Sequence, residues 1–110
     1  MTDTLIAIRP ATPDDVPLIR QLIVELAEYE RMRDAAVATD AALREQLFGA
    51  QPAAEVLLGE VDGQPAGFAL FFHNFSTFLG QRGLYLEDLF VRPQFRGAGL
   101  GKSLMATLAR

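Results

Sequence analysis

The sequence contains no cysteine and a single histidine, His73. Disulfide bonds, thiolate metal sites and a cysteine nucleophile are therefore excluded, and one imidazole cannot build a histidine-rich zinc site, so we expect no metal. Basic residues are also in the minority, because 10 Lys and Arg stand against 14 Asp and Glu, for a net charge of −4. This balance argues against nucleic acid as a partner and favours a small cationic ligand.

Long hydrophobic runs are absent as well. No stretch approaches the roughly 18 apolar residues of a membrane span, and the first four residues, MTDT, lack the basic and apolar regions of a signal peptide. We therefore expect a soluble, cytoplasmic protein with no membrane partner. Its 110 residues, 50% of them hydrophobic, predict one packed domain over residues 1–110.

Hydrophobic periodicity and turn signals predict the element order β-α-α-β-β-β-α. The expected strands are residues 5–9, 55–61, 65–74 and 84–91, and the expected helices run from Thr12 to about Tyr29, from Thr39 to Gly49 and from Leu100 to Arg110. Asp62 and Gly63 form a hairpin turn between two of the strands, which should pair antiparallel. This order is typical of a layered α/β or α+β domain.

The first helix has a well-marked start and a less usual end. Thr12 can cap it, and its buried face is formed by apolar residues at helical spacing: Val16, Ile19, Leu22, Ile23, Leu26 and Ala27. Glu25, Glu28 and Glu30 lie near its C-terminal end, where the helix dipole disfavours negative charge. A solvated face with local ion pairs is one interpretation, and a rim that binds a cation is the other.

Phenylalanine is concentrated in one segment. Five of the eight Phe fall between residues 68 and 78, and the first three lie on both faces of the expected strand. We interpret these five side chains as core or loop packing rather than a ligand-binding box. His73, near the end of that strand, is expected to be structural.

A glycine-rich segment, RGAGLGKS at residues 96–103, lies between the last expected strand and the last helix. Glycines permit close approach of a ligand, and the unpaired amides at a helix start favour an anion, so the segment predicts a phosphate-binding turn. The nucleotide-triphosphate P-loop requires glycine where Arg96 stands, and the dinucleotide pattern G-x-G-x-x-G fails in both registers. The pattern that remains is Arg96-x-x-Gly99-x-Gly101.

This pattern resembles the acetyl-CoA pyrophosphate loop of the GCN5-related N-acetyltransferases (GNAT family). Residues 8–12 (IRPAT) resemble that family's opening strand and turn, while residues 25–30 (ELAEYE) and 84–91 (LYLEDLFV) resemble its diamine, spermidine/spermine-type branch. The resemblance implies a GNAT-like mixed, mostly antiparallel sheet flanked by helices. It also implies transfer of an acetyl group from acetyl-CoA to the primary amine of a small cationic acceptor, polyamine or lysine-like, by direct attack.

The resemblance also implies residue roles. The acetyl-CoA site would comprise Leu89, Phe90, Val91, Arg96, Gly97, Ala98, Gly99, Leu100, Gly101 and Lys102, with the loop amides on the pyrophosphate and the strand backbone on the pantetheine arm. Tyr29 and Glu30 would contact the amine, Glu87 would act as the base through a water molecule, and Asp88 would be a neighbouring contact. Because consecutive strand residues point to opposite faces, we expect only one of Glu87 and Asp88 to face a given cleft.

One part of the family pattern is missing. Family members continue past the loop helix into a strand, a helix with a tyrosine that serves as general acid, and closing strands, whereas this sequence has only Tyr29 and Tyr85, in other positions. We therefore expect a truncated form or a fragment, with an open sheet edge at residues 84–91 that a second copy covers in a homodimer. A catalytically silent CoA-binding or protein-interaction module is the alternative function. A degenerate nucleotide-triphosphate binder is a third, which Arg96 argues against.

Overall fold

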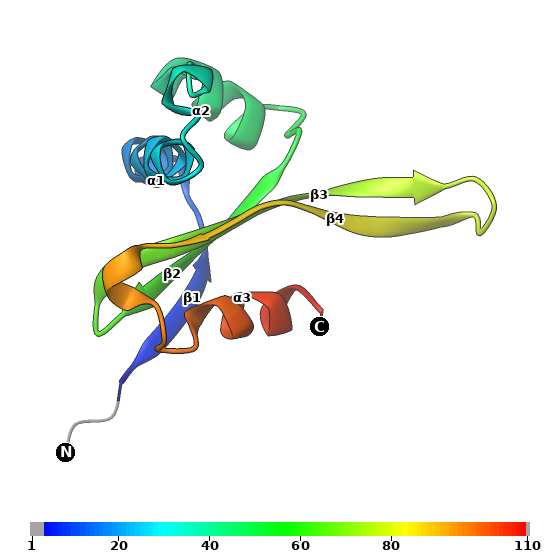
Figure 1. Ribbon diagram of the computed structural model, residues 1–110. Coiled ribbons are helices and arrows are strands. Elements are labelled where there is room, and N and C mark those ends of the chain that lie inside the picture. The colour runs from blue at the N-terminus through cyan, green and yellow to red at the C-terminus, as the bar shows by residue number, and fades with distance from the viewer. Residues whose placement is uncertain (1–3, 110) are drawn as a thin grey trace.

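The computed structural model describes residues 4–109, except for the side chain of Arg33. Within this range one antiparallel sheet has the order β1 (Ile6–Pro10), β2 (Glu55–Val61), β3 (Gln64–Ser76) and β4 (Gln81–Val91). Helices α1 (Val16–Tyr29) and α2 (Asp40–Phe48) cover one face of the sheet, and α3 (Leu100–Leu108) covers the other (Figure 1). The predicted element order and the layered mixed class are confirmed.

The two faces of the sheet have separate cores. On the α1 and α2 side the buried cluster comprises Val16, Ile19, Leu22, Leu43, Leu47, Val56, Leu58, Phe68 and Phe90. On the α3 side it comprises Val61, Ala66, Ala69, Leu100 and Leu104. Burial of apolar side chains on both faces explains why β3 has a nearly continuous hydrophobic sequence. Because Phe90 and Leu100 belong to opposite cores, the loop between them passes around the edge of the sheet.

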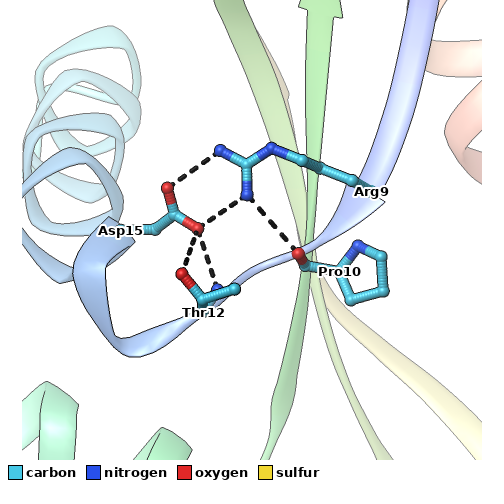
Figure 2. A network of polar contacts seen from close by, with 4 residues as sticks. All are labelled: Arg9, Pro10, Thr12 and Asp15. Atoms are coloured by element: carbon cyan, nitrogen blue, oxygen red, sulfur yellow. Dashed lines mark hydrogen bonds and ion pairs between the residues drawn. The ribbon is translucent and has the colours of Figure 1, made fainter.

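The connection from β1 to α1 is fixed by a small polar network (Figure 2). The Asp15 carboxylate accepts hydrogen bonds from both terminal nitrogens of Arg9, at 2.7 and 2.9 Å, and from the backbone N–H of Thr12 at 2.8 Å. The Arg9 guanidinium thereby holds the pKa of Asp15 well below its usual range. The predicted helix start differs in one respect: Pro13–Asp15 form a 3₁₀ turn (η1), and α1 follows at Val16.

Local signals place the second helix and the hairpin correctly. The Thr39 hydroxyl oxygen accepts a hydrogen bond from the Ala42 N–H at 3.1 Å, as an N-cap does, and Gly49 follows the end of α2. Asp62 and Gly63, with φ of 51° and 79°, form the turn between β2 and β3. Helix α3 ends at Leu108, and the predicted terminal residue Arg110 lies outside the described residues.

Strands β3 and β4 are longer than predicted, because they continue as a two-stranded arm beyond the helices (Figure 1). The arm has polar residues that pair across the two strands, such as Ser76 with Gln81, and their ladder hydrogen bonds need no hydrophobic alternation. Packing is confirmed for the buried Phe68 and Phe71 but is wrong for Phe75 and Phe78, which are 64% and 100% exposed. Neither layer of helices reaches the end of the arm.

The far part of the sheet also contains the single histidine. His73 lies on β3, and its Nε2 is 3.2 Å from a Glu55 carboxylate oxygen on β2. This contact between neighbouring strands fits the structural role that we expect for His73. Strand β4 is at the edge of the sheet in the described residues, as predicted for residues 84–91.

Candidate functional site

The glycine-rich segment adopts the conformation that an anion site requires. After β4 and a short 3₁₀ turn, η3 (Pro93–Phe95), Gly97 and Gly99 have φ of +89° and +91°, a left-handed conformation that favours glycine. Gly99 is the N-cap of α3, and the first helical hydrogen bond runs from the Ser103 N–H to the Gly99 carbonyl at 3.1 Å. The amides of residues 100–102 therefore precede the helical ladder and are free of helical partners.

These amides border a cavity of about 620 Å³ between α1, the end of β4 and the start of α3. Its lining comprises Leu26, Tyr29, Glu30, Leu89, Phe90, Val91, Phe95, Arg96, Gly97, Gly99, Leu100, Gly101 and Lys102. Nine of the ten residues predicted for acetyl-CoA line this cavity, and Ala98 is the exception. Leu26 and Phe95 were not predicted, although Leu26 lies one helical turn before Tyr29.

An ion pair that the sequence analysis missed fixes the end of β4 against α1. Arg92 donates from Nε and one terminal nitrogen to the two carboxylate oxygens of Glu25, both at 2.8 Å, and from its other terminal nitrogen to the Pro65 carbonyl at 3.0 Å. Both side chains of the pair are about four-fifths buried. The Arg92 hydrogen bonds lower the pKa of Glu25, although burial opposes this shift. Glu25 thus pairs with an arginine that lies 67 residues away in the sequence.

Of the two basic residues that line the cavity, Arg96 is the one on the β4 side of the loop. Its guanidinium lies 4.3 Å from the centre of the Tyr29 ring, and its Nε donates to the Val91 carbonyl at 3.1 Å. The side chain therefore lies along the wall where α1 and β4 meet. Lys102, on the first turn of α3, lines the same cavity.

The two acidic residues of β4, Glu87 and Asp88, lie at a β-bulge. Leu70 of β3 pairs with Asp88 and Phe71 pairs with Leu86, so Glu87 is the extra residue. Asp88 is half-buried and lines a second cavity of about 150 Å³ beneath the end of α1, together with Glu30. Burial, followed by the negative charges of Glu87 and Glu30, raises the pKa of Asp88.

Glu87 is exposed and lines neither of these two cavities. The expectation that only one of the two acids faces a given cleft is met, but Asp88 is the one that borders a cavity. The role of Glu87 as a base stays a prediction. Tyr29 and Glu30 lie together on the wall of the large cavity, as the sequence indicates.

Within residues 4–109, no three His, Asp or Glu side chains are grouped so that they could hold a metal ion. The same part of the chain has no helix with the length and hydropathy to cross a membrane.

The fold and the cavity together define a layered α/β domain with a glycine-rich loop between its edge strand and the following helix. The chain belongs to the acetyltransferase (GNAT) family, whose model matches residues 19–110. It is 37% identical over 112 residues to a thialysine N-epsilon-acetyltransferase of Bos taurus and 32% identical over 148 residues to an L-ornithine N5-acetyltransferase of Arabidopsis thaliana. Each match covers 94% of this chain, which spans only 65% of the length of either enzyme.

A solved structure shows the same arrangement. The ribosomal-protein-alanine N-acetyltransferase of Brucella melitensis biovar Abortus 2308 superposes with a TM-score of 0.77 at 27% identity, covering 96% of this chain and 70% of that one. The family resemblance and the predicted GNAT-like fold are confirmed by these matches.

Proposed function

We propose that this chain is an N-acetyltransferase domain that transfers the acetyl group of acetyl-CoA to the primary amine of a small cationic acceptor. The observation that carries the proposal is the 620 Å³ cavity, because one wall is the glycine-rich loop and the other is the edge strand and the end of α1. This arrangement offers a phosphate site and an acidic rim in a single cavity. Family membership and the named relatives support the same reaction.

The cofactor is proposed to bind along β4 and the loop. The amides of residues 97–102 would hold the CoA diphosphate, with Arg96 and Lys102 supplying positive charge. The backbone of residues 89–91 would bind the pantetheine arm, because an edge strand has N–H and C=O groups that no neighbouring strand occupies. A backbone N–H there can also polarise the thioester carbonyl.

The acceptor is proposed to approach from the acidic side of the cavity. A primary alkylamine is protonated at neutral pH, with a pKa of about 10, so carboxylates attract it and one of them must receive a proton before attack. Glu30 and Asp88 share the small cavity next to the cofactor wall, and Glu87 adjoins Asp88. We propose Glu87 as the base acting through water and Asp88 as a contact of the ammonium group.

The step requires no covalent enzyme intermediate. The amine nitrogen attacks the thioester carbonyl carbon, the C–S bond breaks, and CoA leaves as a thiolate that takes up a proton. The absence of cysteine fits this direct transfer. Thialysine and ornithine appear in the names of the relatives, so lysine-like amines and polyamines are the acceptors to test first.

Thermal unfolding with CoA, acetyl-CoA and Mg-ATP, followed by thiol release with a panel of amines, tests the proposal. We expect both forms of CoA to raise the midpoint and a lysine-like amine or polyamine to release thiol. Stabilisation by ATP alone would overturn the proposal. Stabilisation by CoA without thiol release from any amine would favour a silent CoA-binding module, an alternative that the outward position of Glu87 keeps open.

A matched pair of variants then separates the two acids. If Glu87 is the base, Glu87→Gln lowers kcat strongly, whereas Asp88→Asn mainly raises the KM of the amine. The opposite split would assign the base to Asp88. CoA binding should be unchanged in both variants, because neither side chain lines the large cavity.

A cytoplasmic homodimer is part of the same proposal. Outside residues 89–91, which are proposed to bind the cofactor, the edge strand β4 leaves backbone groups open, and the exposed side chains of Phe75, Phe78 and Leu79 on the arm leave apolar surface open. Analytical ultracentrifugation across micromolar concentrations is expected to show a dimer. A stable monomer throughout that range would contradict it.

A further inference from the structure

Tyr29 and Glu30 are consecutive residues at the end of α1, but they face different surroundings. Glu30 lines both the large cavity and the small cavity that contains Asp88. Tyr29 lines only the large cavity, where it lies next to the strand end of the loop. The family resemblance assigns both residues to the amine, whereas their surroundings distinguish them.

The Tyr29 ring is held by a series of aromatic contacts that begins in the core. Phe68 is fully buried and its ring centre lies 6.5 Å from that of Phe90, which is itself buried. The Phe90 ring centre lies 6.3 Å from that of Tyr29, at an interplanar angle of 55°. Although Tyr29 is 59% exposed, its ring thus contacts the buried Phe90 ring at the end of β4.

Arg96 lies on the outer end of this series. Its guanidinium carbon is 4.3 Å from the Tyr29 ring centre, well within the distance of a cation–π contact, and 6.0 Å from that of Phe90. Among the described residues no carboxylate forms an ion pair with Arg96. None of the described residues therefore neutralises its charge in an ion pair, and its Nε is occupied by the Val91 carbonyl at 3.1 Å. The two terminal nitrogens remain for a ligand in the cavity.

We infer that Tyr29 is a positioning residue for the cofactor: its ring holds the Arg96 guanidinium at the cavity wall, where the terminal nitrogens meet the CoA diphosphate. The inference rests on the proposed function, because it takes CoA as the ligand of the large cavity. A flexible arginine loses conformational entropy when it binds a phosphate, and a ring that already orders the guanidinium reduces this loss. Tyr29 thus contributes to CoA affinity.

Calorimetric titration of CoA into the wild type, Tyr29→Leu, Tyr29→Phe, Arg96→Met and the Tyr29→Leu/Arg96→Met double variant tests the inference. We expect Tyr29→Leu to raise the Kd about two- to tenfold, the range of a cation–π contact, and Tyr29→Phe to stay within twofold because the ring is kept. On the Arg96→Met background, Tyr29→Leu should cause no further loss. In turnover, Tyr29→Leu should raise the KM of acetyl-CoA.

Several results would overturn the inference. These are an unchanged CoA affinity in Tyr29→Leu, losses that add in the double variant, an equal loss in Tyr29→Phe, or a rise in the KM of the amine alone. Arg96 is an exposed loop residue, so Arg96→Met probes the same contact from the other side even if Tyr29→Leu proves unstable. If the wild type itself does not bind CoA, the proposed function fails as well. If the wild type binds CoA and one of the results above is found, only the role of Tyr29 fails.

Discussion

Replacement of Gly99 by alanine is expected to lower both the stability of the domain and its affinity for CoA. Gly99 has φ of +91° at the N-cap of α3, and a left-handed conformation costs an L-residue about 1–2 kcal/mol. The added Cβ would meet only Ile6 Cδ1, at 3.9 Å, which is an ordinary contact. Strain in the backbone therefore accounts for the whole loss, about 1–2 kcal/mol, or about 5–10 °C in the thermal midpoint.

Gly101→Ala is the matched control two residues further along the chain. Gly101 lies in the first turn of α3, and its added Cβ would be 4.0 Å from Val91 Cγ2. Alanine is the better helix former by up to about 1 kcal/mol, so the midpoint should stay the same or rise. The two variants add the same methyl group to the same loop and differ in the conformation of the backbone that receives it.

Circular dichroism melts without ligand and calorimetric titration of CoA measure the two effects. If alanine forces Gly99 out of the left-handed region, the following amides rotate, and each charge-assisted hydrogen bond that is lost costs about 1.5–3 kcal/mol. We therefore expect about a tenfold or larger rise in the Kd of CoA for Gly99→Ala and less than a threefold change for Gly101→Ala. Wild-type stability and affinity in Gly99→Ala would refute this reasoning, as would equal losses in the two variants.

Three further substitutions test the fold around the site. Arg92 lowers the pKa of Glu25 below its ordinary 4.5, so the pair stabilises the native state at neutral pH and this contribution is lost as the pH falls through the lowered pKa; urea midpoints of the wild type and Glu25→Gln should differ at neutral pH and converge in acid, below that pKa. Thr39→Ala removes the hydroxyl that accepts from Ala42 and should cost about 1 kcal/mol in urea unfolding, whereas Thr39→Ser should retain the cap and both should bind CoA normally. Gly67→Ala would place a Cβ against the Phe90 carbonyl oxygen of β4, closer than van der Waals contact allows, so it should cost about 1–3 kcal/mol or more by the same measurement.

The element order could be predicted because its signals are local. The cap at Thr39, the turn at residues 62–63 and the helical spacing of apolar residues in α1 each depend on a few neighbouring residues. The glycine-rich loop could be located for the same reason, since its glycines and its arginine lie within six consecutive residues. Contacts between distant segments have no such signal: Glu25 and Arg92 are 67 residues apart, and neither residue by itself identifies its partner.

Hydrophobicity also predicts burial only where another element is present to cover the side chain. Phe68 and Phe75 are the same residue type on the same strand. Phe68 is buried between the sheet and helices α1 and α2, whereas Phe75 lies near the end of β3, in the arm that extends beyond the helices (Figure 1). The sequence of β3 predicts how side chains alternate between the two faces of the strand, but not how far along the strand the helices extend. The exposure of Phe75 and Phe78 therefore could not be read from the pattern that placed Phe68 in the core.

The bulge in β4 has the largest consequence for the site. In a regular strand Leu86 and Asp88 would share one face, because side chains alternate. The extra residue Glu87 breaks this alternation, so Leu86 packs on the α3 side while Asp88 turns to the small cavity under α1. The register that creates the bulge depends on pairing with β3 and is therefore not visible in the sequence LYLEDLFV.

The left-handed glycines and the bulge are both departures from regular structure, and both lie next to the proposed site at the end of β4. Irregular backbone is expected where a domain gives up local regularity for a binding site, and this makes the end of β4 the part of the chain where substitutions will separate function from stability.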